Sequence, residues 1–137
     1  FKTRMHKVFN RQYSLALAAD QNPGSPEHAY WLYFFSKPAP FVTGPDKGAR
    51  RNKTAVVFVK FEKIKRGHYR FVPTIITEDA STLQEGELTL MYRDFLEKTI
   101  REQPENYLWS HRRWKWNYKN EFAGRWIDRV EAPLVKG

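Results

Sequence analysis

The chain has 137 residues, of which 41% are hydrophobic and 16% aromatic, enough for one domain with a single core and too many for a disordered chain. Lys and Arg number 24 against 15 Asp and Glu, and the resulting charge of +9 favours nucleic acid, anionic lipid headgroups or acidic proteins as partners. Cysteine is absent, which excludes disulfides, thiolate metal ligands and a cysteine nucleophile. The sequence also contains no run of about 18 apolar residues, the length that a bilayer-spanning helix needs.

The first elements predicted are a helix and a strand. Apolar residues at helical spacing predict a helix over residues 1–13. The apolar run Ser14–Ala19 predicts a buried strand, which ends in the turn-rich loop Asp20–Gly24. Because open α/β folds place their sites where a strand ends in a polar loop, this loop is a candidate site.

Residues 25–42 hold six aromatic residues and three prolines, a composition that prevents a regular helix throughout. We predict a loop with one short extended piece near Trp31–Phe35. Together with Phe41, these aromatic side chains form either an apolar surface for lipid or a piece of core beneath the loop.

A short helix and a β-hairpin are predicted for the middle of the chain. Thr43 before Gly44-Pro45 is a helix start signal, and the helix over 45–52 would carry Lys47, Arg50 and Arg51. The β-branched run Ala55–Val59 predicts a central strand with a half-exposed continuation to Ile64, and residues 69–77 return after a turn at 65–68. Pro73 places the second strand at an edge or at a bulge.

A long helix follows, and the chain ends in an irregular aromatic segment. Between Glu87 and Glu102 the apolar residues share one helical face, which consists of Leu88, Met91, Tyr92, Phe95, Leu96 and Ile100. Pro104 ends this helix. In the last twenty residues, Phe122, Trp126 and Ile127 are predicted to anchor the chain.

The spacing of the histidines indicates neither a metal site nor a catalytic relay. His6, His28, His68 and His111 are scattered, and no pair has the i, i+4 spacing of a helical zinc site. A Gly-x-Ser-x-Gly elbow and a phosphate-binding Gly-x4-Gly-Lys-Ser/Thr loop are also missing. The sequence therefore predicts no metal ion and no cofactor.

Two segments carry charges that suit a binding or catalytic site. Asp20 either supplies a site carboxylate, which would orient a base or a cationic group, or only caps a turn. The basic and aromatic block His111–Trp116 suits nucleic acid, through stacking and phosphate contacts, and suits a lipid headgroup region equally well. A third possibility is a packed C-terminal segment whose arginines pair with acidic residues.

An ordered set of short motifs runs through most of the chain. The set comprises Ala19-Asp20-Gln21, the run Phe-Phe-Ser-Lys-Pro-Ala-Pro-Phe over 34–41, Thr43-Gly44-Pro45, and Pro104 to Trp109 running into His111–Lys115. Together these motifs resemble the C-terminal part of the lipid A biosynthesis lauroyl/myristoyl acyltransferase family over roughly residues 14–116. The closing Pro-Glu-x-Tyr-x-Trp-x-His-Arg-Arg-x-Lys block is the most specific part.

The resemblance implies an α/β fold: a partial glycerolipid-acyltransferase-like fold with a mixed sheet, flanking helices and a β-hairpin. It also implies an enzyme that transfers a fatty acyl chain from acyl carrier protein to a hydroxyl of a lipid A precursor or a related lipid. The implied location is the cytoplasmic face of the bacterial inner membrane. In this family a His-x4-Asp/Glu motif supplies the general base, and its carboxylate orients the histidine.

The chain departs from the family pattern because His-x4-Asp/Glu is absent. The fifth residues after the four histidines are Arg11, Tyr33, Pro73 and Trp116. We therefore expect a fragment that starts after the catalytic motif and is inactive alone. Only Asp20 is carried over from the family, as a supporting site residue, and four arginines are candidates for phosphate or headgroup binding on charge alone: Arg50, Arg51, Arg112 and Arg113.

Residues 1–116 are expected to be the C-terminal portion of the acyltransferase domain, and residues 117–137 a C-terminal tail. The expected partners are acyl carrier protein, the lipid acceptor and an anionic membrane surface, without nucleic acid. Two alternatives stay open at this point. One is a nucleic-acid-binding module that uses the His111–Lys115 block, and the other is a non-catalytic domain that binds anionic lipid.

Overall fold

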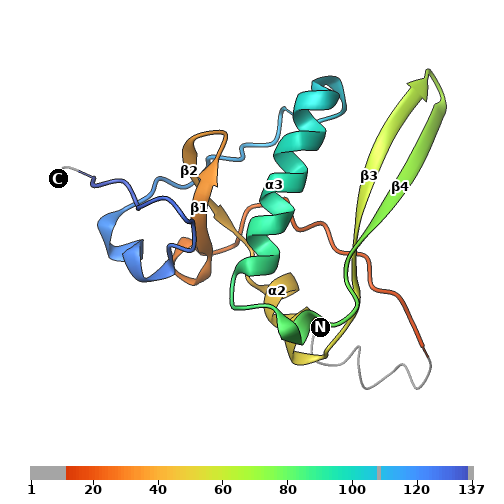
Figure 1. The fold of residues 1–137 in the computed structure, drawn as a ribbon. Coiled ribbons are helices and arrows are strands. Elements are labelled where there is room, and N and C mark those ends of the chain that lie inside the picture. The colour runs from red at the N-terminus through yellow and green to blue at the C-terminus, as the bar shows by residue number, and fades with distance from the viewer. Residues whose placement is uncertain (1–11, 108, 136–137) are drawn as a thin grey trace.

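The computed structural model describes residues 12–107 and 109–135, and their arrangement is shown in Figure 1. The predicted helix over 1–13 lies almost entirely outside these residues. The α/β class is confirmed, with α-helices and two β-hairpins in the described part. The strands form two separate antiparallel sheets of two strands each, where the resemblance implied one mixed sheet. Among the described residues, no helix is long and apolar enough to cross a membrane.

The first hairpin consists of β1 (Tyr30–Phe34) and β2 (Lys37–Phe41). Its two turn residues, Phe35 and Ser36, have φ values of 49° and 60°, as a type I′ hairpin turn requires. The prediction of a loop with one extended piece was therefore wrong for 37–41. The sequence argument counted prolines against a strand. However, Pro38 and Pro40 are two positions apart, so both backbone nitrogens point to the same edge of β2, away from β1. A missing N–H group at these positions costs no hydrogen bond between the two strands.

The helix α2 (Gly44–Arg51) confirms the helix predicted after Thr43. Pro45 lies in its first turn, as the start signal required, but the Thr43 hydroxyl makes no capping hydrogen bond. The helix is polar along most of its length, and the carboxylate of Asp46 is its buried group. The helix therefore packs through a charge, which has to be satisfied inside the protein.

The second hairpin consists of β3 (Val56–Lys65) and β4 (His68–Thr77), joined at Arg66-Gly67. The predicted hairpin is confirmed, and Pro73 lies on an edge strand, since both strands of a two-stranded sheet are edges. The prediction that Ala55–Val59 forms a central strand was wrong. Among the described strands only β4 pairs with β3, and Val57 and Val59 are exposed.

The long helix α3 (Glu87–Glu102) is confirmed, and it ends just before Pro104. Leu88 and Ile100 of the predicted face are buried, and Tyr92 and Leu96 pack against the core. The helix begins after Gly86, whose φ is +84°, and a Cβ at this position would come within 3.0 Å of Ile127. Glycine therefore meets two requirements here, a left-handed backbone and a close neighbour.

The apolar run Ser14–Ala19 is not the buried strand that its composition predicted. Residues 12–18 have no regular secondary structure and are exposed, with Leu15 at 45% and Leu17 at 52% of full exposure. A strand needs a neighbouring strand for its backbone hydrogen bonds. None of the described strands lies beside this segment, because each hairpin pairs only within itself.

The core is built around β1, which is covered on both faces. On one face, Tyr30, Leu32 and Phe34 pack with residues of α3. On the other face, Trp31 packs against Tyr118 and Phe122 from the C-terminal segment, with the Trp31 and Phe122 rings stacked at 5.2 Å. Phe122 belongs to a 3-10 turn, η4 (Asn120–Arg125).

The C-terminal segment is also joined to β1 through its backbone. The Ile127 N–H donates to the carbonyl of Trp31 over 2.9 Å, and a parallel bridge pairs Trp31 with Trp126. Asp128 accepts hydrogen bonds of 2.8 Å from the Tyr33 N–H and from Arg93 of α3. The predicted anchors Phe122, Trp126 and Ile127 are therefore confirmed, and residues 118–128 contribute to the core.

Trp31→Ala tests the central place of β1. Trp31 is 0% exposed, and truncating a buried aromatic residue costs about 3–5 kcal/mol because it leaves a cavity. We expect urea unfolding to show a loss of this size. The matched control is Trp109→Ala at a 57% exposed position, which should change the free energy of unfolding by less than about 1 kcal/mol. Equal losses for the two variants would contradict this account of the core.

Candidate functional site

The loop that carries Asp20 is held by the basic block near the end of the family-like region. The Asn22 side-chain amide donates to the carbonyl of Arg112 over 2.6 Å and accepts from Arg113 over 2.9 Å. The Trp116 indole N–H donates to the carbonyl of Pro23 over 3.3 Å. Two motifs about ninety positions apart in the sequence therefore form one structural unit.

Arg113 is the centre of this unit and is only 1% exposed. Its second terminal nitrogen donates to the carbonyl of Pro40 over 2.8 Å, and its guanidinium carbon lies 4.0 Å from the ring centroid of Phe41. Burial lowers the pKa of Arg113 to about 10, against weaker opposing effects of Tyr107, Asp20 and Tyr92. A buried cation is costly unless its hydrogen bonds are made, so Arg113 fixes the positions of its acceptors.

Asp20 lies close enough to this centre to act on it electrostatically. Burial raises the pKa of both Tyr92 and Tyr107, and the negative charge of Asp20 raises each further. Among the described residues, the Asp20 carboxylate has no hydrogen-bond or ion-pair partner, and it is half-buried. The arrangement is a partly accessible carboxylate beside a buried arginine and two partly buried phenols.

Three buried nitrogens of the basic block have no hydrogen-bond partner among the described residues: His111 Nε2, Arg113 Nε and Trp114 Nε1. Most buried polar groups in proteins are paired, because leaving one unpaired costs about 1–3 kcal/mol. Such groups concentrate where a protein has a use for them besides stability. Their occurrence in three neighbouring residues next to the Asp20 loop makes this unit the strongest candidate site in the described part of the chain.

A second polar cluster surrounds Asp46, which is 1% exposed. Its Oδ2 accepts from the Tyr30 hydroxyl at 3.2 Å and from the Gly86 N–H at 3.3 Å, and Arg50 lies 3.9 Å away. The Tyr30 hydroxyl also lies 2.8 Å from Glu85 Oε1. Burial raises the pKa of Asp46, while Gly86, Tyr30 and Arg50 oppose that rise. This cluster joins α2, β1 and the start of α3.

Sequence analysis did not select Asp46 as a functional residue. The available signal was its position directly after Thr43-Gly44-Pro45, one of the family-like motifs. That motif indicated a helix start, and a carboxylate in the first turn of a helix usually faces solvent. The burial of Asp46 depends on the donors Tyr30 and Gly86, which come from distant parts of the sequence and cannot be paired with it by spacing.

The four predicted arginines do not form one cluster. Arg50 donates to the carbonyl of Leu83 over 3.0 Å and belongs with Asp46, while the neighbouring Arg51 is exposed. Arg112 is exposed, and the next residue, Arg113, is buried. Of the four, only Arg51 and Arg112 present side chains to solvent in a way that a phosphate group could reach without rearrangement of the fold.

The three histidines in the described part of the chain lie in different segments. His28 lies in a 3-10 turn and His68 starts β4, both exposed, whereas His111 is half-buried in the basic block. His6 lies outside the described residues. Within the described part of the chain, no group of three His, Asp or Glu side chains is placed to hold a metal ion.

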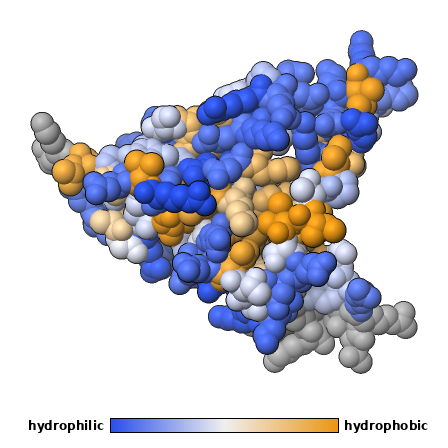
Figure 2. All heavy atoms as spheres, in the orientation of Figure 1, coloured by the Kyte–Doolittle hydropathy of each residue, from blue (hydrophilic) through white to orange (hydrophobic). Residues whose placement is uncertain are grey.

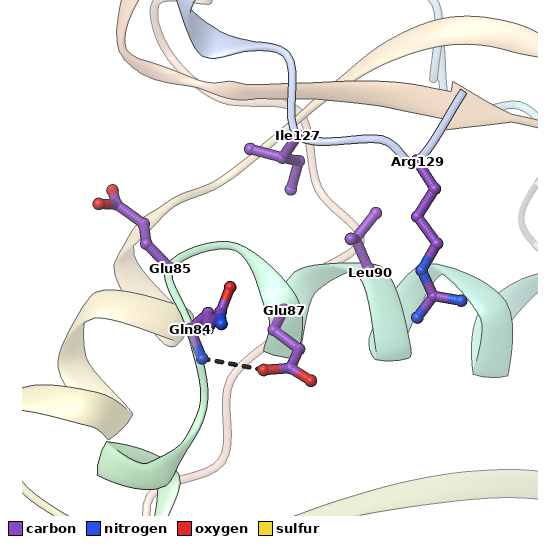
Figure 3. Close-up of a pocket in the computed structure, with 6 residues that line it drawn as sticks. All are labelled: Gln84, Glu85, Glu87, Leu90, Ile127 and Arg129. Carbon is purple, nitrogen blue, oxygen red and sulfur yellow. Dashed lines mark hydrogen bonds between the residues drawn. The ribbon is translucent and has the colours of Figure 1, made fainter. Parts of the chain in front are cut away.

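A shallow pocket of about 320 Å³ lies between the start of α3 and the C-terminal segment (Figure 3). Its lining consists of Gln84, Glu85, Glu87, Leu90, Ile127 and Arg129. Glu87 accepts from the Gln84 N–H over 2.9 Å, as the dashed line marks. None of the predicted site residues lines this pocket. Its two glutamates make it a poor place for a phosphate group.

Comparison with known proteins identifies the family of the chain that carries the Asp20 and Arg113 unit. The family model of the bacterial lipid A biosynthesis acyltransferases matches residues 3–116, well over half of the chain. The chain belongs to this family. No curated protein and no solved structure matches it. The resemblance drawn from the motifs is thereby confirmed.

The family match covers both polar clusters of this lipid A acyltransferase family member. It includes the Asp20 loop, the Asp46 cluster and the second hairpin, and it stops at Trp116, the last residue of the basic block. The segment from residue 117, whose aromatic side chains cover β1, lies beyond the match. The candidate site is therefore made entirely from family-matched residues, while part of the core that supports it is not.

Arg113→Lys tests the structural role of the buried arginine. Lysine keeps the charge but lacks the planar fork, so it cannot reach both Asn22 and Pro40. Leaving one buried acceptor unpaired should lower the free energy of unfolding by about 2 kcal/mol. Arg112→Lys at the neighbouring exposed position is the control and should change little. Urea unfolding of both variants measures the difference, and equal stabilities would contradict the assigned role.

Asp46→Asn tests the buried carboxylate through its pH dependence. Because the pKa of Asp46 is raised in the folded state from its ordinary 3.8, the folded protein binds this proton more tightly. The contribution to stability is full below pH 3.8 and is lost as pH rises through the folded pKa. Relative to the parent, Asp46→Asn should therefore gain stability as pH rises over this window.

The measurement is urea unfolding of both proteins at a series of pH values from 3.5 upward. Glu78→Gln, at an exposed position, is the control and should track the parent at every pH. A stability difference between Asp46→Asn and the parent that is constant with pH would show that the carboxylate does not titrate differently in the folded state.

Proposed function

We propose that this chain is a region of an acyltransferase that transfers a fatty acyl chain from acyl carrier protein to a hydroxyl of a lipid A precursor or a related lipid. The family match over residues 3–116 is the observation that carries the proposal. The placement of Asp20, in a loop held by the most specific family-like block, supports it. The acyl donor, the acceptor and a location at the cytoplasmic face of the inner membrane are parts of the proposal.

The chemistry requires a general base, because a hydroxyl attacks a thioester only when its proton is removed. No histidine of this chain is followed at the fifth position by Asp or Glu. We therefore assign the base to a part of the protein outside this chain, and we expect the chain to be inactive alone. Asp20 would act as a supporting carboxylate, which orients the base or stabilises its protonated form.

The binding of anionic substrate groups is assigned to the exposed cations. Arg51 and Arg112 face solvent and could contact the phosphates of the acceptor or the acidic surface of acyl carrier protein. Arg50 and Arg113 are given a different role from that expected on charge alone. Their guanidinium groups bond to backbone and side chains within the fold, so they position the segments that carry the exposed cations.

The structure gives the nucleic-acid alternative little support. Stacking of bases requires exposed aromatic rings interleaved with free cations. In the basic block, Arg113 is buried and Trp114 packs against Phe34 at 5.8 Å between ring centroids. Lys37 lies over the Trp114 ring at 5.6 Å. The alternation of basic and aromatic residues in the sequence therefore does not produce a continuous stacking surface.

Asp20→Ala tests the assigned site in a protein that also carries the His-x4-Asp/Glu part of the enzyme. We expect a fall in turnover of about 100-fold or more, the usual effect of a residue that supports acid–base catalysis. Transfer of a radiolabelled acyl chain from acyl carrier protein to a lipid A precursor is the measurement. The free energy of unfolding should change by less than about 1 kcal/mol, since the carboxylate has no hydrogen bond among the described residues.

Two controls accompany this assay. Glu78→Ala removes a carboxylate at an exposed position and should keep normal turnover. The present chain alone should give no transfer above buffer. Normal turnover of Asp20→Ala would remove Asp20 from the site, and activity of the chain alone would show that the assignment of the base to another part of the protein is wrong.

A further inference from the structure

The hairpin β3–β4 presents an apolar face that nothing in the described part of the chain covers. The register places Val57 opposite Ile75, Val59 opposite Pro73, and Phe61 opposite Phe71. Directly opposed residues of a strand pair project to the same face, so these side chains form two rows on one surface. Ile75 is 71% exposed and Phe71 is 70% exposed. We call this surface the outer face.

The opposite, inner face of the same hairpin is covered by α3. Phe58, which alternates with Val57 and Val59, is buried and contacts Tyr92 and Phe95 of α3 at 5.2 Å between ring centroids. Lys60 and Glu62 on this face form ion pairs within the chain. The outer face is as apolar as a face that packs into a core, but no described helix covers it as α3 covers Phe58.

The charges of the hairpin are almost all positive. Residues 56–77 hold five cations, Lys60, Lys63, Lys65, Arg66 and Arg70, against the single acid Glu62, a net charge of 5 − 1 = +4. Glu62 is engaged by Lys60 at 2.9 Å and by Arg70 at 2.5 Å. Among the described residues, no ion pair is found for Lys63, Lys65 or Arg66, which surround the tip beside the exposed Ile64.

The shape of the hairpin suits an extended surface better than a small ligand. Its base lies against α3, and its tip projects away from the rest of the molecule (Figure 1). Figure 2 shows hydrophobic atoms on this arm among hydrophilic ones. The aromatic side chains Phe61, Tyr69 and Phe71 lie together near the tip, with ring centroids 4.9 and 5.3 Å apart.

We propose that the outer face of the β3–β4 hairpin docks on the surface of an anionic lipid bilayer. The aromatic and aliphatic side chains enter the zone between headgroups and acyl chains, where such rings are favoured, and the cations at the tip contact the anionic headgroups. This inference deepens the proposed function, on which it rests, by naming the surface that brings the enzyme to its lipid acceptor.

The positive charge of the hairpin favours an anionic bilayer over a second copy of the chain as the partner. Two hairpins that met through their outer faces would bring together two strand pairs of net charge +4, each with Lys63, Lys65 and Arg66, for which the described residues supply no ion-pair partner. Like charges in such a contact are unfavourable, whereas anionic headgroups neutralise them. A bilayer also accepts the apolar rows, which an interaction through phosphate groups alone would leave in water.

The absence of cysteine permits a direct test by site-specific labelling. Ile75→Cys on the outer face and Thr74→Cys, the next residue, which is paired with Phe58 on the inner side, are each labelled with a fluorophore sensitive to polarity. Vesicles of equal parts phosphatidylglycerol and phosphatidylcholine should shift the emission of the label at position 75 to the blue. The label at position 74 should change little. Equal shifts at both positions, or none, would overturn the proposed orientation.

A second measurement removes the apolar contacts without touching the candidate site. We expect Phe71→Ser with Ile75→Ser to weaken sedimentation with these vesicles by about tenfold or more, because burial of such side chains is worth a factor of this size. Thr74→Ser is the control. Replacing Lys63, Lys65 and Arg66 by Gln should remove the preference for phosphatidylglycerol over pure phosphatidylcholine vesicles. Undiminished binding of the double variant would overturn the proposal.

The remaining outcomes are also decisive. If sedimentation equilibrium shows a dimer that the double variant loses, and the parent has no preference for anionic vesicles, the outer face is a contact between copies. Circular dichroism and urea unfolding establish that the variants fold. Vesicle binding is measured without acyl transfer, so a failure of the proposed function would leave the docking result intact, and a failure of docking would leave the transfer assay unaffected.

Discussion

Burial of strand β1 on both faces is the constraint on which the rest of this structure depends. A strand in a two-stranded sheet normally has one face in water, yet every side chain of Tyr30–Phe34 except Tyr33 is buried. One face needs α3 and the other needs the aromatic residues of the C-terminal segment. Arg93 joins these two layers, since it donates to the Tyr33 carbonyl over 2.6 Å and to Asp128 over 2.8 Å.

Two buried charges then place the family motifs relative to this strand. Arg113 ties the Asp20 loop to β2, and Asp46 ties α2 to Tyr30 and to the start of α3. Buried charges contribute little net stability, because desolvation offsets most of their attraction. Their value lies in geometry, since each tolerates only the arrangement that supplies its partners. The segments that carry Asp20 and the exposed arginines are therefore held in fixed positions.

Local signals predicted the elements that local interactions determine. The apolar periodicity of Glu87–Glu102 predicted α3 with correct ends, and the β-branched run Ala55–Val59 with the turn at 65–68 predicted the second hairpin. The predictions were wrong where the outcome depends on distant partners. Ser14–Ala19 has the composition of a buried strand but no described strand beside it, and Lys37–Phe41 forms a strand despite its prolines because β1 needs a neighbour.

The candidate site was predicted in part. Asp20 was selected from the loop and from the family-like motif, while the arginines were selected on charge, which does not distinguish a buried side chain from an exposed one. Arg112 and Arg113 are adjacent and equally basic, yet one faces solvent and the other lies in the core. That difference is set by Asn22 and Pro40, which no spacing in the sequence connects with Arg113.

The docking of Trp126–Asp128 on β1 shows that the end of the family match and the end of the folding unit fall at different residues of this chain. The family match stops at Trp116, while the hydrogen bonds and rings that complete the core of this chain continue to Asp128 and beyond. A sequence family records which positions its members share, and a folding unit is defined by which surfaces must be removed from water. Relatives that share the matched region but end differently would need another solution for the face of β1 that Trp31 occupies, and that face is a place where members of one family can diverge without any change in their chemistry.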